Sequence, residues 1–163
     1  MSRVSTVPVR KHLLSATIVV VSVLVTPGVG PAAGHDETYG LNAALDVLQQ
    51  KPPQSVPVRA AVGTFSATLK LSGSASRLSW RLTFTHLSGR ALQAHIHRGR
   101  LGKSGPVAAT LCNPCKAEMR GSQSLSAGLV RAIKSGGAYV DVHTKKNMRG
   151  EIRGQIRLIT GTA

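Results

Sequence analysis

The segment GTFSATLKLSGSASRLSWRLTFTH, residues 63–86, decides the fold of this chain. Apolar side chains occupy every second position on both sides of the turn Ser72-Gly73-Ser74. Because successive side chains of a β-strand point to opposite faces, this alternation predicts two strands that are each buried on one face. The short turn between them predicts an antiparallel pair.

Shorter segments of the same kind follow along the chain. Their apolar residues are Leu92, Ala94 and Ile96; Val107 to Leu111; Val140 and Val142; and Ile152, Ile156 and Leu158 in a single last strand. One helix is predicted over about 126–135, because Ser126 is a good N-cap and Gly136-Gly137 stops the pattern. Short strands separated by turns predict an all-β fold, an antiparallel Greek-key-like β-sandwich or barrel with one short helix.

The N-terminal segment has the three parts of a secretory signal. Arg3, Arg10 and Lys11 precede the apolar run Leu13–Val25, and small residues follow it. We expect cleavage that removes residues 1–33, and a secreted, extracytoplasmic protein. The alternative is that this segment is not cleaved and anchors the protein. The segment would then be the part through which the protein contacts a membrane. Thirteen residues reach only about 20 Å as a helix, short of the roughly 30 Å hydrocarbon core.

The mature chain is expected to hold a lead-in and one domain. Residues 34–62 form the lead-in, in which residues 39–48 are either a first strand or a short helix. An irregular connector follows, enforced by Pro52, Pro53 and Pro57. The β-sandwich domain itself is expected over residues 63–160.

The chain is strongly basic, with a formal net charge of +15. The predicted signal contains three of the 21 basic residues and none of the six acidic ones, so its removal leaves +12. Such a surface favours anionic cell-surface polymers or an extracellular protein as partner, or it is a soluble surface without a particular partner. Nucleic acid is not expected, because aromatic residues for base stacking make up only 3%. The candidate patch is Arg98, Arg100, Lys103, Lys145, Lys146 and Arg149.

The two cysteines, Cys112 and Cys115, are separated by Asn-Pro. In an oxidising compartment such a pair is typical of a disulfide that clamps a turn. The alternatives are a redox pair and a two-cysteine metal site. A redox pair would need a long helix after the second cysteine, and Gly121 comes too soon for one.

Strand parity brings three histidines to one surface. If the apolar residues of segments 91–97 and 139–143 face the core, then His95, His97 and His143 lie on the outer side of the sheet. The Cα atoms of two histidines at i and i+2 lie about 6.6 Å apart, close enough to chelate one ion. Imidazole suits copper and zinc. The residues expected to support the cluster are Asp141, Thr144, Glu151 and Arg153.

Two alternatives to a metal site remain open for these histidines. They would hydrogen-bond to Glu151, Thr144 and loop carbonyls and hold the loops in place, or they would be exposed without a role. Of the remaining histidines, His86 is expected at the edge of the core. His12 leaves with the signal, and His35 lies near the new N-terminus.

Three motifs resemble the signature of the CHRD domain, the module named after chordin. They are Ala94-His-Ile-His97, Tyr139-Val-Asp-Val-His-Thr144 and Gly150-Glu-Ile-Arg-Gly-Gln155, in that order. The likeness extends from about Gly63 to Leu158. It implies a β-sandwich that occurs singly in secreted bacterial proteins and has no established catalytic reaction.

A weaker likeness is to the copper–zinc superoxide dismutase sandwich, which also carries a His-x-His on the outer face of its sheet. The likeness places His95, His97 and His143 at analogous copper-ligand positions. Residues 98–142 contain no histidine, so the zinc site of that family is absent. A three-histidine copper site remains as a hypothesis.

The sequence therefore favours a non-enzymatic exported module with a binding or cell-surface role. The alternatives are a mononuclear copper or zinc protein and cationic adhesion to anionic cell-surface polymers. No serine nucleophile stands in a motif context, and the loop at residues 99–105 lacks phosphate-loop spacing. The one catalytic alternative is redox activity of the superoxide dismutase kind.

Overall fold

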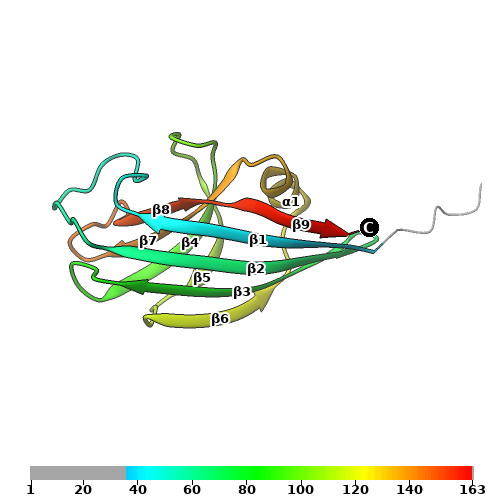
Figure 1. Ribbon diagram of the computed structural model, residues 1–163, viewed down its shortest axis with the longest axis horizontal. Helices are drawn as coiled ribbons and strands as arrows, with labels where there is room; N and C mark the ends of the chain where they lie inside the picture. Colours follow the sequence, from blue (N-terminus) through cyan, green and yellow to red (C-terminus); the bar gives the residue numbers. More distant parts are fainter. Residues whose placement is uncertain (1–35, 163) are drawn as a thin grey trace, which may run out of the picture. The chain divides into compact units, whose positions relative to one another are not determined.

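The computed structural model describes residues 36–162, which form two packed β-layers (Figure 1). The predicted signal over residues 1–33, together with His12 and His35, lies outside the described residues. In this part of the chain, no helix is both long enough and apolar enough to cross a membrane.

The first layer has the strand order β9-β1-β2-β3-β6. Its strands are β1 (Glu37–Asp46), β2 (Val62–Ser72), β3 (Ala75–Thr85), β6 (Glu118–Gln123) and β9 (Arg157–Thr162). The predicted hairpin is β2–β3, which pairs antiparallel without a break from Val62↔Thr85 to Ser72↔Ala75. Alternation in residues 63–86 thus produces the longest strand pair of the layer.

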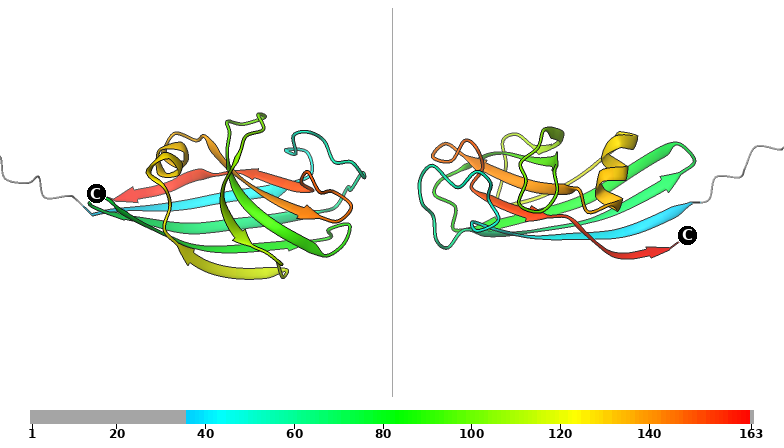
Figure 2. Two further views of the ribbon diagram at one scale, coloured as in Figure 1. Left: turned by 180° about the vertical axis from the view of Figure 1, so that it is seen from behind. Right: turned by 90° about the horizontal axis from the view of Figure 1, so that it is seen from above.

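The second layer has the order β5-β4-β7-β8 and crosses behind the first (Figure 1, Figure 2). Its strands are β4 (Ala91–Arg98), β5 (Val107–Cys112), β7 (Ala138–Thr144) and β8 (Ile152–Gln155). The two layers are joined where β1 pairs with β8, at Asp46↔Arg153.

The core lies between the layers. Its most deeply buried side chains are Leu41, Leu45, Phe65, Leu69, Leu78 and Leu82 from the first layer, and Ala94, Ile96, Val140, Val142 and Ile152 from the second. These are the apolar positions of the alternating segments. The prediction of an all-β antiparallel sandwich is confirmed.

The short helix α1 (Ala127–Lys134) begins and ends where the sequence predicts. The Ser126 hydroxyl accepts a hydrogen bond from the Leu129 backbone N–H at 3.3 Å, which caps the first turn. Leu129 and Ile133 are buried against the sandwich. Gly136 follows with φ +67°, a left-handed conformation that favours glycine.

Two strands differ from the sequence expectation. β6 was not predicted, because its residues EMRGSQ show no apolar alternation; it pairs with the edge of β3 through its backbone. The single predicted last strand is wrong: it divides into β8 and β9 around the buried Ile156. β8 pairs with β7, whereas β9 pairs with β1, so the chain passes from one layer to the other at this residue.

Three smaller expectations also have definite outcomes. Residues 37–46 form a strand and not a helix, and this strand lies inside the sheet beside β2. Cys112 and Cys115 form a disulfide at the end of β5. His86 does not lie at the core edge: β3 ends at Thr85, and the chain turns outward there, with His86 exposed at φ +58°.

Candidate metal centre

The histidine surface belongs to the paired strands β4 and β7. In their register His95 faces Asp141 and His97 faces Tyr139, all on the side away from the core. This surface is nonetheless buried, and the three histidines are only 6–9% exposed. Loops 47–61, 99–106 and 145–151 run over it. Strand parity therefore predicted the side of the sheet on which the histidines lie, but not their burial.

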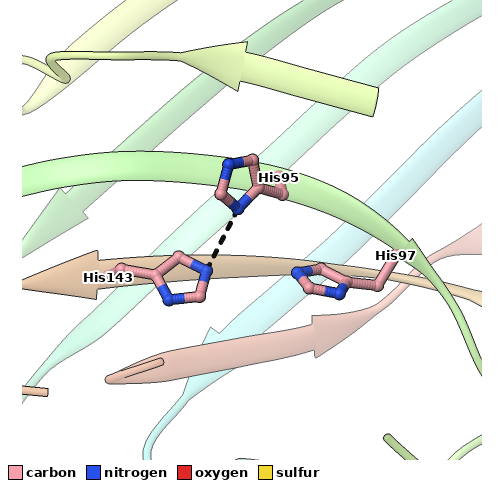
Figure 3. A group of neighbouring side chains, drawn as sticks. All are labelled: His95, His97 and His143. Atoms are coloured by element: carbon pink, nitrogen blue, oxygen red, sulfur yellow. Dashed lines mark hydrogen bonds between the residues drawn. The ribbon is translucent and has the colours of Figure 1, made fainter. Parts of the chain in front are cut away.

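The three imidazole rings converge. Each ring offers one nitrogen, and these three atoms all lie within 4.8 Å of one another (Figure 3). The shortest separation is 3.2 Å, between Nδ1 of His95 and Nε2 of His143. The rings of His95 and His97 meet edge to face, with centroids 5.7 Å apart.

Backbone carbonyls fix two of the rings. Nδ1 of His97 lies 3.0 Å from the Gly105 carbonyl oxygen, and Nδ1 of His143 lies 3.0 Å from that of Met148. A carbonyl only accepts hydrogen bonds, so both Nδ1 atoms carry the proton and both Nε2 atoms present a lone pair. The Nε2 atom of His97 is buried and has no hydrogen-bond partner among the described residues. Metal-binding histidines are oriented in this way.

All three imidazoles are held neutral. Burial, together with the neighbouring His95 and His97, lowers the pKa of His143 to about 4. Burial and His97 lower the pKa of His95. Burial and the Arg153 charge lower the pKa of His97, although its hydrogen bond to Gly105 acts in the opposite direction. Neutral imidazole is the form that binds a metal ion.

Tyr139 and Arg153 form a stack against His97. The Tyr139 ring lies parallel to the His97 ring, with centroids 4.8 Å apart and an interplanar angle of 8°. Arg153, on β8, places its Cζ atom 3.5 Å from the centroid of the Tyr139 ring. The guanidinium also donates to the carbonyl oxygens of Arg100 and Lys103, at 3.2 and 2.9 Å. Arg153 thus joins the strand surface to the loop that carries Gly105.

Asp141 lies opposite His95 in the β4–β7 register and is almost fully buried. Gln50 Nε2 donates to its Oδ2 at 3.3 Å, whereas Oδ1 has no partner among the described residues. Burial raises the pKa of Asp141 to about 7, although Gln50 and Arg153 oppose the shift. Gln50 belongs to the proline-rich connector, where no sequence signal singled it out.

Glu151 and Thr144 form no hydrogen bond with the three histidine rings. The Glu151 carboxylate accepts hydrogen bonds from Ser88, from the Thr144 hydroxyl at 2.6 Å and from Asn147 Nδ2 at 3.0 Å. Burial raises the pKa of Glu151, but these donors outweigh it and hold the pKa below its usual value. Asn147 also exchanges hydrogen bonds with the Val56 backbone, so this network fastens two of the covering loops to each other.

The candidate cationic patch lies at the end of β4 and on two of the loops that cover the histidines. All six of its side chains are exposed: Arg98, Arg100, Lys103, Lys145, Lys146 and Arg149. None of these side chains belongs to the histidine cluster.

The family model of the CHRD domain matches residues 41–156. This span covers most of β1, all of β2 to β8 and the three histidines. No curated protein and no solved structure matches the chain.

Proposed function

Since the chain belongs to the CHRD domain family, we propose that it is a non-catalytic module that holds one copper or zinc ion on His95, His97 and His143. One observation carries this proposal. Three neutral, buried imidazoles direct one nitrogen each to a common point, with all three atoms within 4.8 Å. A purely structural set of histidines would not need an unpaired Nε2 on His97.

The donor set suits these two metals. Imidazole nitrogen binds zinc and copper at about 2.0–2.1 Å, and three such nitrogens around one ion lie roughly 3.3–3.6 Å apart. The widest separation in the cluster would therefore close by about 1 Å on binding. The carbonyls of Gly105 and Met148 supply the outer hydrogen bonds that orient metal-binding histidines.

The charged residues near the histidines affect whether a monovalent or a divalent ion is bound more tightly. Arg153 lies behind Tyr139 and repels a cation at the cluster, and Asp141 compensates only in its ionised form. Repulsion by a fixed charge doubles from a monovalent to a divalent ion. A monovalent copper ion therefore meets less opposition than zinc, and both need to be tested.

The test is metal analysis of the whole chain. Protein incubated with Cu(I), Cu(II) or Zn²⁺ and freed of excess ion by gel filtration should retain one ion per chain. The variant His95→Ala/His97→Ala should lose at least 100-fold in affinity. His86→Ala is the control, because His86 is exposed and outside the cluster. Equal metal retention by the wild type and the double variant would refute the proposal.

We also propose that the protein works after export. The predicted signal supports this, and so does the Cys112–Cys115 disulfide, since disulfides persist in oxidising compartments. N-terminal sequencing of protein made in an exporting host should place the mature N-terminus near residue 34. An intact N-terminus on the exported chain would contradict cleavage.

A further inference from the structure

We propose that the outer face of the first layer binds an anionic polysaccharide. This face is the side of β9-β1-β2-β3-β6 that points away from the core, and its side chains are exposed. The residues that the argument uses are Asn42, Ser66, Thr68, Lys70, Arg77, Ser79, Arg81, Arg120, Ser122 and Arg157. In Figure 1 the layer lies in front of the second layer, and no other element crosses it.

The strand register aligns a cationic row across five strands. Asn42 pairs with Arg157 on one side and with Ser66 on the other; Ser66 pairs with Arg81, and Arg81 with Arg120. With strands about 4.8 Å apart, three spacings place Arg157 roughly 14 Å from Arg81. Hydroxyl and amide groups fill the positions between the arginines.

Along the strands, rows of cationic side chains alternate with a row of hydroxyl side chains. Thr68, Ser79 and Ser122 form a row of hydroxyls, and Lys70 and Arg77 form a second cationic row beyond it. Along β3, Arg77 and Arg81 are about 13 Å apart with Ser79 halfway. Rows of cations therefore flank a row of hydroxyls.

Part of this charge arrangement does not help the fold. Lys70 lies directly opposite Arg77, and Arg81 directly opposite Arg120, and like charges at such positions destabilise a sheet. Glu118 pairs with Arg81 at 2.9 Å and Arg120 at 3.3 Å. Among the described residues, the side chains of Lys70, Arg77 and Arg157 form no hydrogen bond or ion pair.

The face is also hollowed. A shallow cavity of about 490 Å³ is lined by Ser66, Thr68, Ser79, Arg81 and Arg120, together with the exposed Ile159 and other apolar residues of the same strands. Its lining offers guanidinium forks, which match carboxylate and sulfate groups, and hydroxyls, which match those of a sugar.

Other occupants fit this face less well. Trp80, the aromatic residue that lines this cavity, is 6% exposed and belongs to the core, so it offers no platform for the stacking of bases. A second copy of the chain would bring two cationic faces together. A polymer that carries both anionic groups and hydroxyls matches the alternating rows.

The experiment measures binding of the whole chain to polygalacturonate and to dextran sulfate, with neutral dextran as a blank. EDTA is present, so the result does not depend on the histidine cluster. The variant Arg81→Gln/Arg120→Gln should bind at least tenfold more weakly. Lys70→Gln/Arg77→Gln should weaken binding as well, and it breaks no ion pair. The matched control Lys51→Gln/Arg59→Gln removes the same charge from an exposed loop outside this face and should stay within twofold.

Three results would overturn the proposal. The first is equal weakening by the loop control, which would assign binding to net charge alone. The second is equally tight binding of single-stranded DNA or polyphosphate, which would assign the face to another polymer. The third is the absence of binding to both polysaccharides at low salt.

Discussion

Nδ1 of His95 lies 3.2 Å from Nε2 of His143, although the two residues are not opposite each other in the β4–β7 register. His95 pairs with Asp141, and His143 pairs with Gln93, so the imidazoles meet diagonally across the strands. Because His143 donates its Nδ1 proton to the Met148 carbonyl, its Nε2 accepts here and His95 is the donor. A hydrogen bond thus joins the His95 and His143 rings at the place where an ion would bind.

The first prediction concerns the tautomers of the metal-free protein. His97 and His143 should both be Nδ1-protonated, because each donates to a carbonyl oxygen. Long-range ¹H–¹⁵N correlation spectra at pH 7 distinguish the two tautomers. The urea-unfolded chain serves as the reference. An Nε2-protonated ring at either residue would mean that its carbonyl contact is not a hydrogen bond.

The second prediction concerns pH and stability without metal. His143 has a folded pKa of about 4, below its unfolded value of 6.5, so its contribution to stability is lost as the pH falls from 6.5 to 4. Asp141 has a folded pKa of about 7, above its unfolded value of 3.8, so its contribution is lost as the pH rises over that range. Each of these changes in the free energy of unfolding amounts to about 3–4 kcal/mol, and they have opposite signs as the pH rises.

Variants separate the two contributions. Relative to the wild type, the free energy of unfolding of His143→Gln should fall more, or rise less, as the pH rises from 4 to 7, because the His143 contribution is gone and that of Asp141 remains. That of Asp141→Asn should rise over the same range. Urea unfolding at a series of pH values measures both. Parallel curves for the two variants would show that at least one pKa is not shifted as stated.

The third prediction concerns Arg153. Replacement with Lys keeps the charge but cannot maintain both hydrogen bonds to the Arg100 and Lys103 carbonyls. The loop over residues 99–106 should then open more often, and its amide hydrogens should exchange at least tenfold faster. Arg100→Lys is the control, because only the backbone of Arg100 takes part. Unchanged exchange in Arg153→Lys would mean that other contacts hold the loop.

The fourth prediction concerns Gly150, which has φ +113°. A Cβ atom there would clash with Gln50 Nε2 and with Asp141 Oδ1. Gly150→Ala should destabilise the protein by at least about 2 kcal/mol, from backbone strain and from the displaced side chains. Gly73→Ala also has a positive φ, but nothing lies within 4 Å, so about 1 kcal/mol is expected. If urea unfolding showed the same loss of stability for Gly150→Ala and Gly73→Ala, a steric contribution at Gly150 would be excluded.

The fifth prediction concerns the disulfide. Cys112→Ala/Cys115→Ala opens a loop of only four residues, so the loss of stability should be about 2 kcal/mol. Metal affinity should stay within twofold, because the disulfide lies in the core and not on the histidine surface. A larger change in metal affinity would indicate that the disulfide positions β4.

Much of the histidine cluster could be predicted from the chain alone. Alternation in segments 91–97 and 139–143 places the histidines on one side of their strands, since side-chain direction alternates with period two. The convergence of the nitrogens could not be predicted, because it depends on the register of β4 against β7 and on the carbonyls of two loops. Nor did local sequence single out Gln50, which reaches Asp141 from 91 residues away.

The sequence by itself determined the all-β fold, the hairpin predicted at residues 63–86, the capped helix and the family, because these depend on local periodicity, turn chemistry and motif order. Only the tertiary structure decided the pairing of β6, the division of the last strand at Ile156 and the burial of the histidines beneath loops. It also aligned Arg157, Arg81 and Arg120 in one row. Each of these depends on which distant strands and loops pack together, and short-range patterns carry no record of such long-range contacts.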